Sequence, residues 1–392
     1  MPLTGIRVVD LTRIVSGPFC TMLLADMGAE VIKIETPGKG DPLRAQGVIK
    51  NGLSWYYASF NRNKKSITLD LRSPEGRDIL IRLIRKSDVV VDNYRPGVMK
   101  KMGLDYERLK KINPGIIHCG ISGFGVGGPS AGRPAFDFIA QAMSGLMSVN
   151  GSQESGPMRV SLPISDLITG LYGAFGVACS LTQRLRSGQG EEVQTSLVDS
   201  LISFMAYMSA NFLASGELPQ RTGNDHPIVA PYGLFPAKDG EVAIAPSNDD
   251  VYEKLLDALE LQHLKTDARF ATNDLRMHNR QAINRIVAEK IKTMPKSYWV
   301  EHLNRAGVPT GLIQNMEEVF EDQQVLHQEM VMDVDQPEYG KIQMTGFPVK
   351  MRNNPCEVYL PAPRLGEHTR QVLEELGYSE SEIKTLKGKR VT

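Results

Sequence analysis

The sequence has few cysteines and no metal-binding motif. Its 392 residues include four cysteines, Cys20, Cys119, Cys179 and Cys356, and no CxxC pair. This spacing predicts neither a disulfide framework nor a zinc site, and it fits a reducing compartment. The seven histidines contain no HExxH motif, so we expect no metal centre.

The hydropathy pattern of the sequence predicts neither an export signal nor a membrane span. Arg7 and Asp10 interrupt the stretch where a secretory signal needs an apolar run. The longest charge-free runs, 138–153 and 167–183, contain Gly, Ser, Thr or Asn and are shorter than the roughly 20 apolar residues that span a bilayer. We therefore expect a cytoplasmic protein without a membrane partner, in which these runs form buried core helices.

Charge of one sign is not in excess, because 45 Lys and Arg residues balance 45 Asp and Glu residues. A net charge of zero argues against a protein that coats a polyanion, so we expect no nucleic-acid partner. Hydrophobic residues make up 41% of the chain and charged residues 23%, which is typical of a folded globular protein. The length predicts two or three domains.

Strand-length apolar runs alternate with helical segments over the first 125 residues. We expect strands at 6–9, 30–34, 66–71, 88–91 and 115–119, and helices at 17–28, 74–86 and 106–112. Ser73 followed by Pro74 is typical of a helix start. The alternation predicts an α/β fold, a Rossmann-like open parallel sheet with helices on both faces.

The middle of the chain is predicted to be mostly helical. We expect helices at 138–147, 167–184 and 195–215. Gly170, Gly173 and Gly176 recur every third residue in the second of these helices, and each costs about 1 kcal/mol of helix propensity. We therefore expect close packing along that face.

A smaller domain is predicted after a boundary rich in proline and glycine. The boundary lies at 227–240, and residues 241–325 predict short strands followed by amphipathic helices, a smaller α+β domain. A last helix is expected at 367–376, between Gly366 and Gly377.

One glycine-rich segment, Gly123 to Gly128, contains GxGxxG directly after a predicted strand. A dinucleotide-binding fingerprint opens a helix and has an acidic residue about 20 positions further on. This segment runs into Pro129 and Pro134 instead, so we expect a loop that approaches a ligand or another backbone. The P-loop motif is absent, and so is the GxSxG nucleophile elbow.

Asp166 precedes an almost wholly apolar helix. Two interpretations stay open on the residues alone. Asp166 can cap the helix, a common role worth about 1 kcal/mol. Alternatively, the helix N-terminus keeps the carboxylate ionised in a dry setting, where it can act as a nucleophile.

Basic residues gather where predicted parallel strands end. Arg13 follows the first strand, Leu69 to Arg72 follow another, and Asn93 to Arg95 precede Lys100 and Lys101. Open α/β sheets bind ligands at this edge. We expect a cationic rim for a phosphorylated, nucleotide-like ligand, with Tyr94 packed against a ring.

Many segments together resemble the class III CoA-transferases, which include formyl-CoA:oxalate, carnitine and glutarate-type enzymes and have the α-methylacyl-CoA racemases as relatives. They run collinearly over almost the whole chain: VVDLTRIVSGPFCTMLLADMGAEVIKIETPGKGD, FNRNKKSITLDLRSPEG, VDNYRPGVMKKMGLDY, GFGVGGP, FDFIAQAMSGLM, ISDLITGLYGA, DGEVAIAPSN, GVPTG and LGEHTRQVLEELGYS. The resemblance implies a large Rossmann-like domain from 1–215 and 331–392, a linker and small domain at 216–330, and a homodimer of interlocked rings, which would pack closely against the glycines of the helix after Asp166.

The resemblance also implies a covalent mechanism. The nucleophilic aspartate of the family falls on Asp166, whose carboxylate attacks an acyl-CoA thioester to form an aspartyl anhydride and then an aspartyl-CoA thioester. CoA is thus a substrate, and no permanently bound cofactor is expected. The CoA contacts transfer by similarity to Arg13, Val15, Ser16, Leu69, Asp70, Leu71, Arg72, Asn93, Tyr94, Arg95, Lys101, Ala135, Phe136 and Asp137.

The chain departs from formyl-CoA transferase at two places. Thr36 replaces a basic residue after the second strand, so phosphate contact there falls to Lys39 or Arg44. A glycine-rich loop is absent, and Gly223 to Pro231 takes its position. Both differences argue against a formyl or oxalate substrate.

Transfer is favoured over racemisation. Racemases pair the aspartate with a histidine in a GHD segment, and Phe136 stands at that histidine here. The C-terminal half resembles the glutarate- and succinate-type branch, which suggests a succinyl-CoA-like donor and a dicarboxylic acid, with Arg44 or His226 as the reader of the distal carboxylate. The alternatives are an α-methylacyl-CoA racemase and a non-catalytic acyl-CoA-binding protein.

Overall fold

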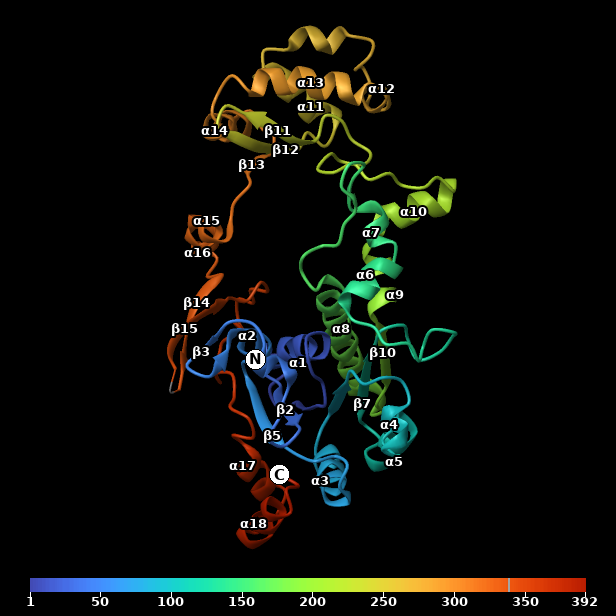
Figure 1. Ribbon diagram of the computed structural model, residues 1–392, viewed down its shortest axis with the longest axis vertical. Helices are drawn as coiled ribbons and strands as arrows, with labels where there is room; N and C mark the ends of the chain where they lie inside the picture. The colour runs from blue at the N-terminus through green and yellow to red at the C-terminus, as the bar shows by residue number, and fades with distance from the viewer. Residues whose placement is uncertain (338) are drawn as a thin grey trace. The chain divides into compact units, whose positions relative to one another are not determined.

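The computed structural model describes residues 1–337 and 339–392, which form two compact units. The first unit consists of Met1–Leu146, Val160–Ser209 and Leu326–Thr392, and the second of Met147–Arg159 and Ala210–Val325. Both chain ends therefore belong to the first unit, as Figure 1 shows.

A six-stranded parallel sheet forms the centre of the first unit, with the order β10-β7-β6-β1-β2-β5. Its strands are β1 Arg7–Asp10, β2 Glu30–Glu35, β5 Lys64–Thr68, β6 Val89–Asp92, β7 Ile117–Ser122 and β10 Glu192–Ser196. The central strands β1 and β6 are buried almost throughout, as expected where helices cover both faces. The predicted α/β class with a parallel sheet is confirmed.

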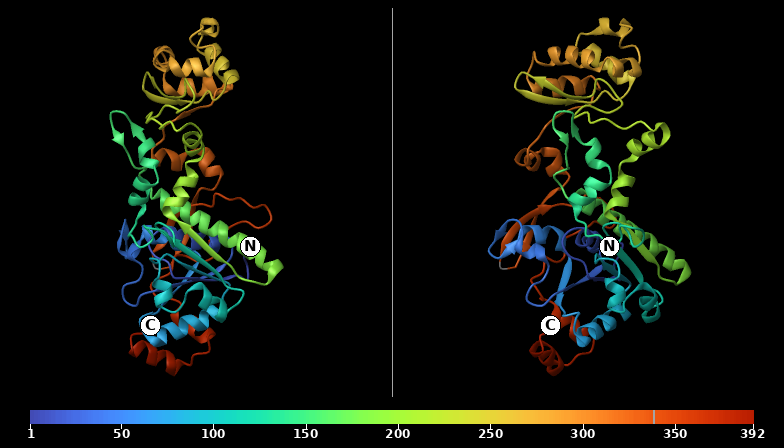
Figure 2. Two further views of the ribbon diagram at one scale, coloured as in Figure 1. Left: turned by 90° about the vertical axis from the view of Figure 1, so that its right-hand side faces the viewer. Right: turned by 45° about the vertical axis from the view of Figure 1, so that its right-hand side comes forward.

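Alternate residues of each strand enter two separate cores. Val8 and Val89 pack with helices α1 Ser16–Asp26 and α8 Ile164–Ser187 on one face. Val9 and Val90 pack on the other face with α3 Pro74–Arg85, α5 Tyr106–Ile112, α17 Thr369–Glu375 and α18 Glu380–Gly388. Figures 1 and 2 show the two helical layers around the sheet. Ser73 caps α3 by accepting a hydrogen bond from the Gly76 N–H, as predicted.

The remaining elements of this unit are short. They are η1 Pro42–Ala45, β3 Ile49–Lys50, β4 Leu53–Ser54, α2 Trp55–Asn61, α4 Val98–Lys101, α6 Asp137–Met143, α9 Leu197–Phe204, β14 Val331–Gln336 and β15 Gly340–Thr345. α7 Leu146–Val149, α10 Ala206–Ser215 and α16 Gln323–His327 cross the borders between the units.

The glycines of α8 face close neighbours, as their spacing predicts. A Cβ atom at Gly170 would come within 2.5 Å of the Ser16 carbonyl oxygen, and one at Gly176 within 2.6 Å of the Val193 side chain. Both neighbours belong to the same chain, so α1 and β10 fill the role that the resemblance assigned to a partner subunit.

α8 is also the only single helix in the described part of the chain that is long and apolar enough to cross a membrane; the bent pair α9 and α10 passes the same test together. Half of the most apolar window of α8 is buried within the protein. This burial is typical of a core helix, which is what the sequence predicts for this segment.

One helix prediction is wrong, and one helix was not predicted. The single helix expected at 195–215 is split: β10 continues to Ser196, whose side chain caps α9, and the axis turns by 79° before α10, where Ala206 has φ 47°. The helix predicted at 367–376 is confirmed as α17, but the helix that follows it, α18, was not predicted from the sequence. Ser379 and Glu382 form a capping box at its start, a signal that the sequence contains.

The second unit contains a three-stranded antiparallel sheet, β11 Gly233–Ala237, β12 Gly240–Ile244 and β13 Thr310–Leu312. Its other elements are β8 Gly151–Ser152, β9 Gly156–Pro157, α11 Asp249–Ala258, η2 Gln262–Thr266, α12 Asn273–His278, α13 Arg280–Ile291, α14 Lys296–Arg305 and α15 Met316–Glu321. Phe235, Phe270 and Trp299 belong to its separate core. Strands with amphipathic helices were predicted for this segment.

Candidate active site

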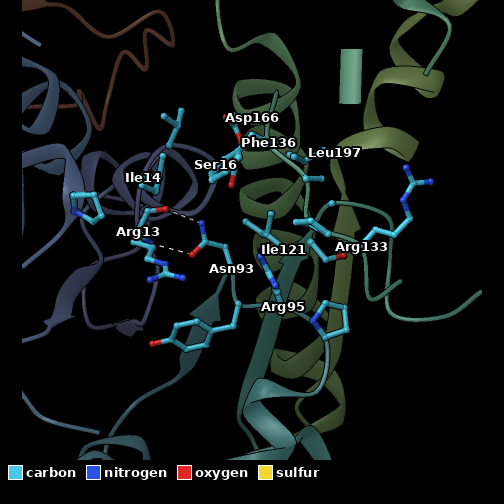
Figure 3. Close-up of a pocket in the computed structure, with 18 residues that line it drawn as sticks. Arg13, Ile14, Ser16, Asn93, Arg95, Ile121, Arg133, Phe136, Asp166 and Leu197 are labelled. Carbon is cyan, nitrogen blue, oxygen red and sulfur yellow. Dashed lines mark hydrogen bonds between the residues drawn. The ribbon is translucent and has the colours of Figure 1, made fainter. Parts of the chain in front are cut away.

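A cavity of about 360 Å³ opens at the carboxyl ends of β1, β6 and β7. Its lining residues are Arg13, Ile14, Val15, Ser16, Pro42, Asn93, Tyr94, Arg95, Pro96, Ile121, Ser122, Gly123, Arg133, Pro134, Ala135, Phe136, Asp166 and Leu197. In Figure 3, Asp166, Ser16 and Phe136 lie together at one end of this group, and Arg13, Asn93 and Arg95 follow below them. The cavity therefore joins one carboxylate to several cationic side chains.

Asp166 is the third residue of α8 and not its N-cap, so the capping interpretation is wrong. The N-cap position is Pro163, which offers no side-chain acceptor. Asp137 takes that role from α6: its Oδ1 accepts hydrogen bonds from the Ser165 N–H at 2.9 Å and from the Ser165 hydroxyl at 2.8 Å. The Asp166 carboxylate is left to line the cavity.

Burial and, less strongly, the nearby Asp137 carboxylate raise the pKa of Asp166, a hydrogen bond from Ser16 lowers it, and the net result is a pKa of about 7. Our expectation that the helix N-terminus would hold this group ionised is therefore wrong in direction. Desolvation of the carboxylate and repulsion by Asp137 outweigh the helix dipole here. Asp166 consequently changes its charge near neutral pH.

The loop between β1 and α1 forms one wall of the cavity. Asn93 holds the Arg13 backbone from both sides, because its Oδ1 accepts from the Arg13 N–H at 3.0 Å and its Nδ2 donates to the Arg13 carbonyl at 2.7 Å. The dashed lines in Figure 3 mark these bonds. The backbone of Arg13 is thereby fixed while its guanidinium stays exposed.

Most of the predicted contact residues line this cavity together with Asp166: they are Arg13, Val15, Ser16, Asn93, Tyr94, Arg95, Ala135 and Phe136. Asp137 is buried behind the wall, where Gln141 Nε2 also donates to it at 2.7 Å. Leu69, Asp70, Leu71 and Arg72 lie outside this lining, as does Lys101 at the end of α4. Their contact with CoA stays a prediction.

Arg133 is a lining residue that sequence reasoning missed. It lies in the loop between β7 and α6, and its guanidinium stands 5.3 Å from the centre of the Phe124 ring. The one signal in the sequence for Arg133 was its position two residues before the predicted contact Ala135. A loop sequence does not show which of its side chains point into a cavity.

Arg44 was expected to bind a phosphate or a distal carboxylate, and its contacts contradict this. It forms an ion pair with Glu35 at 2.7 Å and donates to the Tyr57 hydroxyl and the Pro363 carbonyl. The guanidinium also lies 3.8 Å from the centre of the Tyr57 ring. These internal partners occupy Arg44, whereas Lys39 is exposed on the turn that follows Thr36.

His226 belongs to the second unit, in the segment from Gly223 to Pro231. Its ring lies 4.7 Å from that of Tyr232, and its carbonyl accepts a hydrogen bond from Arg280 Nη2 at 2.6 Å. Burial lowers the pKa of His226, and the Arg280 charge adds to this effect. Its role as a carboxylate reader stays a prediction.

The glycine-rich segment is a loop, as predicted, and no helix opens at it. Gly123 lines the cavity, and α6 begins only at Asp137. A Cβ atom at Gly123 would come within 2.5 Å of the Ala135 side chain, so the glycine permits a close approach between the two ends of the loop that joins β7 to α6. Among residues 1–337 and 339–392, no group of three or more His, Cys, Asp or Glu side chains could hold a metal ion.

A parallel sheet with a half-buried carboxylate and cationic side chains at its carboxyl edge is an arrangement suited to acyl-group or CoA chemistry. The class is established by comparison: the pattern of CoA-transferase family III matches residues 3–369. The chain therefore belongs to CoA-transferase family III, which confirms the resemblance stated above, and it is a CoA-transferase.

Individual relatives extend over nearly the whole chain. The human succinyl-CoA:glutarate CoA-transferase is 38% identical over 376 residues, 96% of this chain and 86% of the relative. The succinate–glutarate CoA-transferase of Agrobacterium fabrum is 37% identical, with 96% of each chain covered. Among solved structures, a CAIB/BAIF family protein from Brucella suis is 36% identical and has a TM-score of 0.83, with 96% of this chain and 99% of that chain covered.

Proposed function

We propose that this family III CoA-transferase moves CoA from a succinyl-CoA-like donor to a dicarboxylic acid, with Asp166 as the covalent nucleophile. The observation that carries the proposal is the position of Asp166, which lines a cavity shared with Arg13, Arg95 and Arg133. Cationic side chains suit the phosphates and carboxylates of the substrates. No residue other than Asp166 contributes a carboxylate to the lining.

The first half-reaction proceeds in two steps. An Asp166 carboxylate oxygen attacks the thioester carbonyl, the C–S bond breaks, and CoA leaves as a thiolate from a mixed anhydride. The thiolate then attacks the Asp166 carbonyl carbon, which forms an aspartyl-CoA thioester and releases the donor acid. The acceptor carboxylate repeats both steps in reverse order, so no net proton or electron is transferred and Asp166 is regenerated.

The surroundings of Asp166 suit these reaction steps. Ile14, Phe136 and Leu197 provide apolar walls, which limit access of water to an anhydride that would otherwise hydrolyse. The carboxylate is also destabilised by burial and by Asp137, and formation of the anhydride removes its charge. Formation of the covalent intermediate therefore relieves an unfavourable interaction.

The substrate class is inferred from the relatives. Proteins named succinyl-CoA:glutarate and succinyl-CoA:D-citramalate CoA-transferases are 38% and 35% identical to this chain. A racemase would need a second proton-transfer group opposite Asp166, and Phe136 has no titratable side chain. Transfer between dicarboxylic acids is therefore the reaction we propose, with acyl-CoA racemisation and acyl-CoA binding without turnover as the alternatives that the assay below separates.

We also propose that the enzyme is a cytoplasmic homodimer of interlocked subunits, with a large domain from 1–215 and 331–392 and a linker and small domain from 216–330. Large apolar side chains are exposed on the described surface of one chain, among them Leu171 and Phe175 on α8 and Phe204 on α9. A partner subunit would cover such a surface. Light scattering coupled to size-exclusion chromatography tests this, and a monomer of 43.3 kDa would contradict it.

The decisive experiment measures CoA exchange and covalent trapping in one preparation. Succinyl-CoA is offered with a panel of organic acids, and Asp166→Ala is expected to lose exchange by at least about 10³-fold while its circular dichroism spectrum is unchanged. In the wild type, hydroxylamine added during turnover should convert Asp166 to a hydroxamate, which peptide mass spectrometry detects. Wild-type activity in Asp166→Ala, or a hydroxamate on a residue other than Asp166, would contradict the mechanism.

A further inference from the structure

The loop between β1 and α1 is held by side chains from three other parts of the sheet edge. Asp10 Oδ1 accepts from the Thr12 N–H at 2.9 Å, and Lys33 Nζ donates to the Thr12 carbonyl at 2.9 Å. Asn93 holds Arg13, and Asp41 accepts from the Ile14 N–H at 3.2 Å. The backbone that leads to Ser16 and the cavity is therefore anchored at each of three successive residues.

Lys33 and Asp41 form a buried ion pair beneath this loop. Their Nζ and Oδ2 atoms lie 3.0 Å apart, and the side chains are 0% and 1% exposed. A buried ion pair is weak evidence for stability, because apolar residues of similar volume often stabilise a protein as well or better. What apolar residues cannot do is donate to the Thr12 carbonyl and accept from the Ile14 N–H.

The conformation of Ile14 explains why such an anchor is needed. Ile14 has φ 71°, a left-handed conformation that is strongly disfavoured for a β-branched residue. A residue in this state persists only when its surroundings hold it there. The Asp41 carboxylate supplies that hold through the Ile14 N–H, and Ile14 itself lines the cavity.

The charge on Lys33 is secured by its neighbours. Burial alone would lower the pKa of Lys33, but Asp10, Asp41 and Glu35 raise it above its ordinary value. The groups that face it are these three carboxylates and Lys64, whose own pKa burial lowers to about 8. The ammonium group therefore remains a donor to Thr12 throughout the neutral pH range.

We infer that Lys33 and Asp41 are positioning residues: they fix Ile14 in its left-handed conformation, and this fixes Ser16 against the Asp166 carboxylate. The link to the reacting group is Ser16, which lines the cavity with Asp166 and lies beside it in Figure 3. The inference rests on the proposed role of Asp166 as nucleophile. Neither Lys33 nor Asp41 lines the cavity, so both act through the loop.

Two neutral double variants test the contact with Ile14, and the second also removes the acceptor that Asp41 offers to the Leu43 N–H. In Lys33→Met with Asp41→Asn, the amide oxygen can still accept from the Ile14 N–H. In Lys33→Met with Asp41→Leu, no acceptor remains, although both variants have lost the ion pair. We expect kcat for CoA exchange to fall about threefold in the first and about 30-fold or more in the second, with similar KM values for the donor and a Tm that is lower in the second by no more than the loss of one helix cap explains.

Adding Ile14→Gly to each double variant supplies the second readout. Glycine adopts φ near 70° without strain, so the loop then depends less on the acceptor. The tenfold difference in kcat between the two backgrounds should shrink to about threefold or less. A purely structural role predicts the opposite, because removing the Ile14 side chain lowers Tm in both backgrounds without recovering activity.

The pair Asp26 and Arg62 provides a matched control. It is also buried, with side chains 4% exposed and 2.8 Å between Oδ2 and Nη2, and its hydrogen bonds go to Asn63 and Thr345. Asp26→Leu with Arg62→Met should leave kcat within about twofold. Equal kcat in the Asn and Leu variants, or a kcat that simply follows Tm, would overturn the inference. If Asp166→Asn retains exchange, the proposed function fails instead.

Discussion

Three loops at the same edge of the large sheet differ in what closes them. The loops after β1 and β6 carry Arg13 and Asn93 and face an open cavity. The loop after β5 is closed by the C-terminal part of the chain: the Asp70 N–H donates to the Val391 carbonyl at 2.7 Å, and Leu69 is only 2% exposed in the core. All three loops follow parallel strands, yet only the loops after β1 and β6 leave their polar groups open to the cavity.

Strand order accounts for the difference. β1 and β6 are neighbours near the middle of the order β10-β7-β6-β1-β2-β5, where chain connections leave the sheet in opposite directions, whereas β5 is an edge strand. A crevice forms where such connections diverge, and an edge strand is covered by whichever segment packs beside it. Here that segment is α17 and α18 with the residues around them. This difference leads us to expect that the central loops contribute more to CoA binding than the edge loop does.

The strongest test compares arginines of the two regions. Arg13→Ala together with Arg95→Ala should lower kcat/KM for the CoA donor by about 10²- to 10³-fold, because two charge-assisted contacts are lost. Arg72→Ala should change it by no more than about threefold. Steady-state kinetics with varied succinyl-CoA measures both effects. An equal loss of kcat/KM in the two variants would contradict the comparison, because it would mean that both regions bind the donor.

Leu69→Ala tests whether the edge loop contributes to stability. Leu69 is 2% exposed and packs in the core with Ile67 and Leu80, so its truncation should lower the free energy of unfolding by about 3 kcal/mol. KM for the donor should stay within about twofold in the surviving folded enzyme. Urea titration and steady-state kinetics test this. A large rise in KM with unchanged stability would contradict the proposed difference between the central loops and the loop after β5.

Asp166→Asn should stabilise the fold at high pH. The folded pKa of about 7 lies above the ordinary value of 3.8, so the folded state loses stability as pH rises from about 4 to 7, and the full loss remains above pH 7. The amide removes this effect, and we expect a gain of about 2 kcal/mol at pH 8 that shrinks as pH falls from 7 towards 4. Scanning calorimetry at pH 8 and pH 5 is the measurement; a pH-independent difference would contradict it.

The smallest expected effect concerns the pH profile. Because the nucleophile must be ionised, kcat/KM should rise with pH through about 7. Asp137→Asn removes a carboxylate that raises the pKa of Asp166 while an amide oxygen remains to accept from Ser165, so the rising limb should move to lower pH. At pH 6 the variant should retain roughly two- to fivefold more of its plateau rate than the wild type. A shift to higher pH would contradict this electrostatic account.

The sequence predicts the fold class and the candidate nucleophile for physical reasons that act locally. Alternating apolar runs and the Ser73 cap determine the elements of the sheet, and Asp166 stands before an apolar helix. The sign of the pKa shift of Asp166 could not be predicted, because it depends on Asp137, 29 residues away in the sequence, and on burial by other elements. The role of Arg44 was misjudged for the same reason, since its partner Glu35 is buried by tertiary packing.

The hydrogen bonds between the two ends of the chain have a consequence for synthesis. The Gly366 N–H donates to the Ser66 hydroxyl at 3.0 Å, and the His368 N–H donates to the Ser66 carbonyl at 2.9 Å. During translation, about 300 further residues must therefore be synthesised before the segment that covers the β5 edge of the sheet exists. Until then it presents unpaired backbone groups, the usual template for association between nascent chains. Ribosome-associated chaperones thus have a defined edge to protect in this enzyme.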